Sequence, residues 1–162
     1  MKTLKLRKRK SKTDYANRLK LLKNEKPRVV FRRTNRYILV QYVTSREARD
    51  KIEFGITSKE LIKYGWPKEA EGSLKSIPAS YLTGYLIGKQ IIQKKMKTPI
   101  VDFGMLRTSH KTKVFAFLQG LLDAEVKIKC EKGFPEKERI AGGSLKNKID
   151  FQKIKSNIGN IK

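Results

Sequence analysis

The spacing of apolar positions changes from helical to extended near residue 27. From Tyr15 to Leu22 apolar residues recur at helical spacing, directly after the capping pair Thr13-Asp14, so we predict a short helix to about residue 23. Residues 28–33 and 37–43 are then dominated by β-branched and aromatic side chains, and the three residues between them suit a turn. This pattern predicts an antiparallel hairpin with a cationic tip.

The rest of the chain alternates between the same two periods. A long helix is predicted from Pro78 over about five turns, and its Gly84 and Gly88, one turn apart, indicate close packing on the sheet. Segments 99–104, 114–122 and 126–130 have the strand, helix, strand order of a βαβ unit with a right-handed crossover. The remaining predicted elements are a strand at 51–57, a short helix capped by Ser58 that runs to Tyr64, and a last helix at 151–158.

These elements predict an α/β fold in which a mixed sheet, begun by the antiparallel hairpin, continues with parallel strands and carries helices on its faces. We divide the chain into a basic N-terminal arm with a short helix (1–27), an α/β core domain (28–131) and a basic C-terminal extension (132–162). The first dozen residues have too little apolar content to order themselves, so we expect them to be disordered in the free protein.

Charge separates the arm from the core. The chain holds 39 Lys and Arg against 15 Asp and Glu, a formal charge of +24. Residues 1–36 hold 15 basic and 2 acidic residues, whereas residues 37–126 hold 14 and 9, as in an ordinary domain. The last 36 residues hold 10 and 4. Self-repulsion concentrated in this way predicts a polyanionic partner.

Several protein classes are excluded by composition. The lone cysteine, Cys130, rules out a disulfide framework and fits a reducing compartment, which we take to be the cytoplasm. No apolar run approaches the roughly 20 residues of a membrane span, and the N-terminus has no apolar signal-peptide segment. We therefore expect neither a membrane partner nor a secreted protein.

The cationic segments contain the side chains that RNA recognition requires. Lysines and arginines of the arm would bind phosphates and release counterions, while the hairpin tip adds amide, hydroxyl and aromatic groups that contact bases and 2′-hydroxyls. A purely electrostatic patch would not need this mixture. The candidate RNA-binding residues are Arg7, Lys8, Arg9, Lys10, Lys12, Arg18, Arg32, Arg33, Thr34, Asn35, Arg36 and Tyr37.

Catalysis has no specific signal in the sequence. The triplet Asp102-Phe103-Gly104 matches a kinase metal-binding motif, but no glycine-rich phosphate loop accompanies it. Cys130 and His110 are the only thiol and imidazole, and we predict no cofactor, metal site or small-molecule substrate. Two alternatives stay open here: a metal-dependent nucleic-acid-processing enzyme that uses Asp102 or Asp123, and a general polycation that adheres to anionic membranes or chromatin.

Four stretches of the chain resemble a known family. They begin at Thr13, Lys63, Val101 and Gly133 and read TDYANRLKLLKNEKPRVVFRRTNRYILVQYV, KYGWPKEA with IPASYLTGYLIGKQ, VDFGMLRTSHKTKVFAFLQGLLDAEVKI, and GFPEKERIAGG. Their order and spacing resemble large-subunit ribosomal protein eighteen in its archaeal and eukaryotic form, and the lack of a long C-terminal extension looks more archaeal.

The resemblance implies a non-enzymatic ribosomal protein that binds 5S rRNA, helps to anchor it to the large rRNA at the central protuberance, and contacts neighbouring large-subunit ribosomal proteins. It implies a three-layer α/β/α fold over a mixed sheet. By the same resemblance, RNA contacts fall on the arm, on the hairpin and on a later loop, at Arg7, Lys8, Arg9, Lys10, Tyr15, Arg18, Arg32, Arg33, Asn35, Arg36, Arg107, Ser109, Lys111 and Lys113.

Two positions depart from the family pattern. Family members often carry a glycine in the 107–113 loop, which this chain lacks, so we expect a different loop path. The helix that ends near Asp123 is commonly closed by glycine, whereas this chain has Glu125. A non-glycine residue in a left-handed cap costs about 1 kcal/mol, so we expect this helix to end differently.

Overall fold

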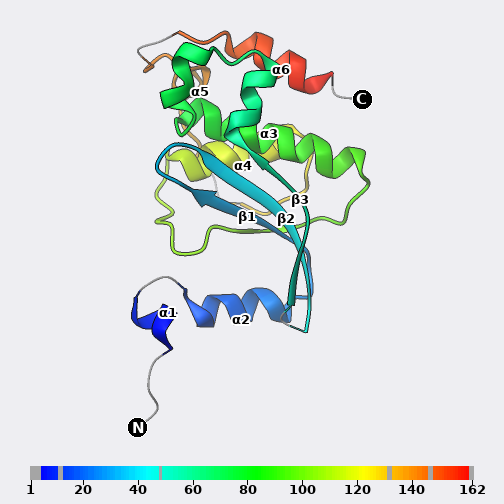
Figure 1. Ribbon diagram of the computed structural model, residues 1–162. Coiled ribbons are helices and arrows are strands. Elements are labelled where there is room, and N and C mark those ends of the chain that lie inside the picture. The colour runs from blue at the N-terminus through cyan, green and yellow to red at the C-terminus, as the bar shows by residue number, and fades with distance from the viewer. Residues whose placement is uncertain (1–4, 11–12, 48, 131–132, 146–147, 161–162) are drawn as a thin grey trace.

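The computed structural model describes residues 5–10, 13–47, 49–130, 133–145 and 148–160, with the backbone alone at residues 7 and 8. These residues form α-helices, 3₁₀ helices (η) and a four-stranded sheet. Figure 1 shows how the helices are arranged around the sheet. In chain order the elements are α1 (Leu6–Arg9), α2 (Tyr15–Lys23), β1 (Arg28–Arg33), β2 (Ile38–Arg46), β3 (Arg49–Thr57), η1 (Ser58–Tyr64), η2 (Lys68–Ser73), α3 (Ile77–Gln93), β4 (Ile100–Asp102), α4 (Lys113–Asp123), α5 (Lys137–Ala141) and α6 (Phe151–Gly159).

The sheet is mixed and begins with the predicted hairpin. Its strand order is β3-β2-β1-β4, with β1 antiparallel to β2, β2 antiparallel to β3, and β4 parallel to β1. Val29 pairs with Tyr42 in the hairpin and with Val101 across the parallel pair. The α/β class and the mixed sheet are therefore confirmed.

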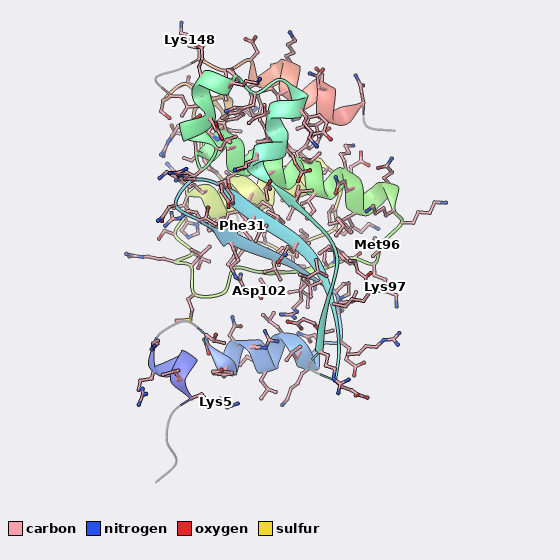
Figure 2. The ribbon with its side chains drawn as sticks, in the orientation of Figure 1. Lys5, Phe31, Met96, Lys97, Asp102 and Lys148 are labelled. Atoms are coloured by element: carbon pink, nitrogen blue, oxygen red, sulfur yellow. The ribbon has the colours of Figure 1, made fainter. Side chains whose placement is uncertain are left out.

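Helices lie on both sides of this sheet (Figure 1). The α3 and α4 helices cover one side, with α5, α6 and the η helices beyond them, and α2 lies on the other side. Alternate residues of β1 and β2, such as Val29 and Val40, point into the core and are fully buried. Phe31 meets Phe117 of α4 with a ring-centroid distance of 4.7 Å, near the middle of the molecule (Figure 2).

The predicted strand at 126–130 is wrong, and with it the predicted βαβ unit. The chain leaves α4 through a left-handed residue, Glu125 (φ 71°), and the Val126 N–H donates to the carbonyl of Leu121 at 3.1 Å. Val126 is then buried against Gly88 of α3. Because helix capping and packing hold the start of this segment, it follows α4 without joining the sheet, and β4 pairs with β1 instead.

The end of α4 therefore also differs from our expectation. Glu125 itself adopts the left-handed conformation that we expected a non-glycine residue to avoid here. Its N–H donates to the carbonyl of Leu122 at 2.8 Å, which with the Val126 bond completes a Schellman motif. The two capping bonds and the burial of Ala124 and Val126 outweigh the backbone strain of this residue.

The two glycines of α3 pack against a helix, not against the sheet as predicted. A Cβ atom at Gly84 would clash with the backbone carbonyl of Phe117, and one at Gly88 would lie 2.5 Å from the Cβ of Ala124. From the other side, a Cβ at Gly120 would clash with the carbonyl of Tyr81. Three small residues thus let the α3 and α4 backbones approach each other closely.

Capping explains where two further elements begin. The carboxylate of Asp14 accepts the N–H groups of Ala16 and Asn17 at 3.0 and 3.2 Å, which confirms the predicted start of α2. The predicted cap of the next short helix is wrong: Ser58 is buried and its hydroxyl accepts the Ile38 N–H at 3.0 Å. Instead, Glu60 accepts the N–H of Thr57 at 2.9 Å, and the helix is 3₁₀.

The two ends of the chain differ in how they are held. One helical turn, α1, lies within the arm that we expected to be disordered, and Lys12 lies outside the described residues. The C-terminal extension contributes apolar side chains to the core rather than forming a separate tail. The buried apolar side chains that α5 and α6 contribute are Ile140, Phe151, Ile154 and Ile158.

Candidate RNA interface

A tight turn presents the cationic tip of the β1–β2 hairpin. The Thr34 N–H and hydroxyl donate to the Tyr37 carbonyl at 2.9 and 2.7 Å, and the Thr34 hydroxyl accepts the Tyr37 N–H at 3.0 Å. Thr34 therefore shapes the turn, and the side chains of Asn35 and Arg36 are left exposed. The half-buried ring of Tyr37 lies beneath Lys59, whose Nζ is 5.0 Å from the ring centroid.

The 107–113 loop leads into α4 along a path held by its own backbone. Lys111 is left-handed (φ 56°), and its N–H donates to the carbonyl of Gly133 at 2.8 Å. The Thr112 hydroxyl donates to the carbonyl of Ser109 at 2.6 Å. Lys111 thus takes the conformation that a glycine adopts readily, and its exposed Nζ reaches Glu136 at 3.3 Å.

The hairpin and this loop meet in one groove of about 370 Å³, which we call the cationic groove. Partial burial lowers the pKa of Lys113, and the nearby positive charges of Arg33 and Lys75 lower it further. Like charges held this close repel one another, so a bound anion would relieve the repulsion. The polar side chains that line the groove are Arg33, Arg107, Ser109, Lys111, Thr112, Lys113 and Arg139.

Two cations of this region were missed in the sequence. Lys75 donates from Nζ to the carbonyl of Asn35 at 2.8 Å, which ties it to the hairpin tip. Arg139 reaches the groove from α5, far along the chain. Lys75 stands outside the charge runs and the quoted stretches, and Arg139 lies in the stretch GFPEKERIAGG, which carries no local sign of where its side chain points. Only the tertiary structure brings the two cations to the site.

Two predicted RNA-binding arginines are engaged within the protein. Arg32 donates to the Asp102 carbonyl at 2.9 Å and to its carboxylate at 3.2 Å. Arg18 of α2 pairs with Asp50 of β3 at 2.9 Å. Their roles toward RNA remain predictions, but both side chains already serve the fold.

Arg28 links these two ion pairs. It is 2% exposed and contacts Asp50 at 2.7 Å and Asp102 at 3.5 Å. Partial burial opposes ionisation of Asp50, but the Ser45 hydroxyl and the charges of Arg28 and Arg18 hold its pKa below the ordinary value. Asp102, labelled in Figure 2, is the last residue of β4. Together with residues of α2 it lines a second groove, which Arg33 also borders. Arg33 therefore connects the arm side of the molecule with the cationic groove.

The arm contributes further cations. Arg9 and Lys10 are exposed, whereas only the backbone of Arg7 and Lys8 is described, within α1. Tyr15 is half-buried, and the Nζ of Lys5 lies 4.7 Å from its ring centroid. Figure 1 shows α1 and α2 well apart from the helices around the cationic groove.

The carboxylates named for the nuclease alternative are occupied by other groups. Asp102 accepts the Gly104 N–H at 2.7 Å in addition to its arginines, and Asp123 accepts the Tyr81 hydroxyl and pairs with Lys155 at 3.5 Å. Within the described part of the chain, no group of three or more His, Cys, Asp and Glu side chains could hold a metal ion. Nor does any helix among the described residues have the length and apolarity to cross a membrane.

The geometry is thus that of a cation-rich α/β protein without an assembled catalytic centre in its described residues. A family profile described as "Ribosomal large subunit proteins 60S L5, and 50S L18" matches residues 1–101. The large ribosomal subunit protein uL18 of Korarchaeum cryptofilum is 42% identical over 137 residues, which cover 84% of this chain and 68% of the relative. Its namesake in Methanoregula boonei is 38% identical over 137 residues, with 84% and 76% covered. That of Haloferax volcanii is 38% identical over 122 residues, with 75% and 64% covered.

The chain belongs to this family of large-subunit ribosomal proteins. The family identity confirms the resemblance seen in the four sequence stretches and points to a structural, non-enzymatic protein of the cytoplasmic ribosome.

Proposed function

We propose that the chain assembles into the large ribosomal subunit, binds 5S rRNA through the cationic groove and the basic arm, and helps to anchor it to the large rRNA at the central protuberance. The observation that supports this most is the convergence of Arg33, Lys75 and Lys113 with the hairpin tip. Separate segments of the chain supply these cations, so the groove can match the shape of a folded RNA rather than any polyanion.

The groove and the hairpin tip would do different work. Lysines and arginines around the groove would bind successive phosphates. The exposed amide of Asn35 would hydrogen-bond a base edge or a 2′-hydroxyl, and the guanidinium of Arg36 would stack on a base or fork onto a phosphate. The arm would add phosphate contacts from its own side, and Arg33 lies between the two regions.

A comparison of RNAs tests the proposal. Filter binding would measure the affinity of the full chain for 5S rRNA and for an unrelated RNA of equal length at moderate salt. We expect tighter binding to 5S rRNA and recovery of the chain with purified large subunits. Equal affinity for both RNAs would contradict specific recognition.

Single substitutions separate the groove from general charge. We expect Arg33→Ala and Asn35→Ala each to weaken 5S rRNA binding by about 1 kcal/mol or more, because each removes a contact that depends on position. The control is Lys153→Ala, an exposed lysine of α6 that does not line the groove. An equal loss for the control would show that net charge alone decides affinity.

Deletion of residues 1–12 tests the arm. Each phosphate that the shortened chain no longer neutralises should lower the salt slope of binding by somewhat under one, so this variant should bind with a shallower slope. If the slope did not change, the arm would not contact RNA.

A further inference from the structure

The β4 strand forms an edge of the sheet, and no described strand pairs with its outer side. The Ile100 N–H donates inward to the Pro27 carbonyl at 2.8 Å. Because backbone groups alternate in direction along a strand, the N–H and carbonyl of Val101 point outward. An edge of this kind is a template for another strand.

A groove of about 720 Å³ lies along this edge. Phe115, Leu118 and Leu122 of α4 and the side chains of Val101 and Phe103 give it an apolar lining. Residues 127–130 also line it, without strand pairing of their own. The groove thus combines an unpaired backbone edge with an apolar surface, which is the pair of features that an added strand uses.

Charge indicates what kind of strand would fit. Lys26, Lys127 and Lys129 border the groove, and none of the described residues that line it is acidic. The lining is chiefly apolar, unlike the arginine and lysine groove proposed for RNA. We propose that this groove receives an extended segment of a neighbouring protein, with alternating apolar and acidic residues, that adds a strand to β4. That the neighbour is a ribosomal protein depends on the function proposed above; the groove itself does not.

The sole cysteine provides a local readout, because Cys130 lines the groove and is half-exposed. The probe is a synthetic peptide in which valine alternates with glutamate and threonine, added to the full chain without RNA. The measurement is the rate at which iodoacetamide alkylates Cys130. We expect saturating peptide to slow this reaction about tenfold, because an added strand would cover the thiol. A peptide of the same composition with its valines grouped at one end should give little protection.

Two variants of Val101 test strand addition directly. Val101→Pro removes the outward N–H, a change that edge strands tolerate, whereas Val101→Thr keeps it. We expect Pro to abolish the protection of Cys130 and Thr to preserve it. Protection that persists in the Pro variant, or equal protection by the grouped peptide, would overturn the proposal. So would 5S rRNA that protects Cys130 as well as the peptide does, because RNA would then occupy the groove.

A charge exchange keeps the proposal testable if Val101→Pro does not fold. Lys127→Glu with Lys129→Glu should weaken the acidic peptide about tenfold and should favour a peptide with lysine in place of glutamate. If the double variant still preferred the acidic peptide, the proposed role of the lysines that border the groove would be contradicted. RNA affinity is measured separately, so failure of this test would not affect the 5S rRNA proposal. Likewise, failure of the 5S rRNA proposal would not affect the proposal that this groove receives a strand.

Discussion

At the scale of single residues, two non-glycine residues are strained because their backbone is left-handed. Glu125 and Lys111 both have positive φ and are not glycine, at 71° and 56°. In each case a backbone hydrogen bond of 2.8 Å fixes the conformation, from the Glu125 N–H to Leu122 and from the Lys111 N–H to Gly133. Replacing either residue by glycine should therefore remove backbone strain and stabilise the folded protein.

Glu125→Gly should raise the free energy of unfolding by about 1 kcal/mol, because glycine adopts the left-handed region without strain. Urea denaturation would measure the change. Glu125→Ala is the control, since it removes the same carboxylate but keeps a Cβ atom in the strained conformation. Equal stabilisation by both variants would assign the effect to charge instead.

At the scale of elements, an ion-pair network joins α2 to the sheet. No residue of α2 is buried, and Leu19 is 56% exposed, so apolar packing contributes little to its position. Arg18 instead pairs with Asp50, which also pairs with the buried Arg28. The arm is thus held to the β2–β3 hairpin largely by charge.

Asp50→Asn should lower the free energy of unfolding at neutral pH by about 1–3 kcal/mol, because it leaves Arg28 with a weaker set of partners. The folded pKa of Asp50 lies below its ordinary value of 3.8, so the carboxylate stabilises the protein above that pH. Its advantage over the variant should disappear as the pH falls from about 4 through the lower, folded pKa. Urea denaturation at several pH values would test this.

The matched control for Asp50 is Glu53→Gln on the same strand, whose partner Lys51 is exposed. We expect no measurable loss there, since exposed ion pairs contribute little. A loss equal to that of Asp50→Asn would mean that the buried arginine is not the cause.

Substitution of a glycine at the contact between α3 and α4 tests how closely the two helices approach each other. Gly120→Ala should destabilise the fold by about 3 kcal/mol, because the new Cβ would meet the backbone of Tyr81, which cannot yield as a side chain can. Gly72→Ala is the control, since nothing lies within 4 Å of a Cβ there. Thermal unfolding of both variants measures the difference, and similar midpoints would contradict the helix contact.

The same elements show how far sequence reasoning reaches. Local signals predicted α2 from its capping pair and the hairpin from its turn, since the causes lie within a few residues. The strand predicted at 126–130 is wrong although its apolar and polar residues do alternate. The apolar side chains pack against the rest of the fold, but the backbone does not pair with a strand. Asp102, the partner of Arg32, lies 70 residues further along the chain. Arg139 reaches the groove from a separate helix, α5. No local sequence pattern predicts either contact.

At the scale of the whole molecule, charge and core are arranged separately. The formal charge is +24, yet one continuous apolar core runs from β1 to α6. Cations gather in the arm and around the groove, where partial burial, and then the charges of Arg33 and Lys75, lower the pKa of Lys113. The free protein therefore carries repulsion that a polyanion would remove.

Added salt should act on stability and on RNA binding in opposite directions. Raising NaCl from about 0.05 to 0.5 M should raise the Tm of the free protein by about 2–4 °C, because screening weakens self-repulsion. The same change should weaken binding of 5S rRNA. Calorimetry and filter binding measure the two effects, with sucrose as the uncharged control; a Tm that falls with salt would contradict the repulsion.

The position of α6 has a consequence for biosynthesis. Phe151, Ile154 and Ile158 pack in the core that α3 crosses, and Phe151 meets the ring of Tyr81 at 5.3 Å. A ribosome makes α3 long before it makes α6, so during translation this apolar face emerges without its cover. The core of the nascent chain therefore stays incomplete until residue 158 leaves the exit tunnel, so the last steps of folding can occur only after synthesis is nearly finished.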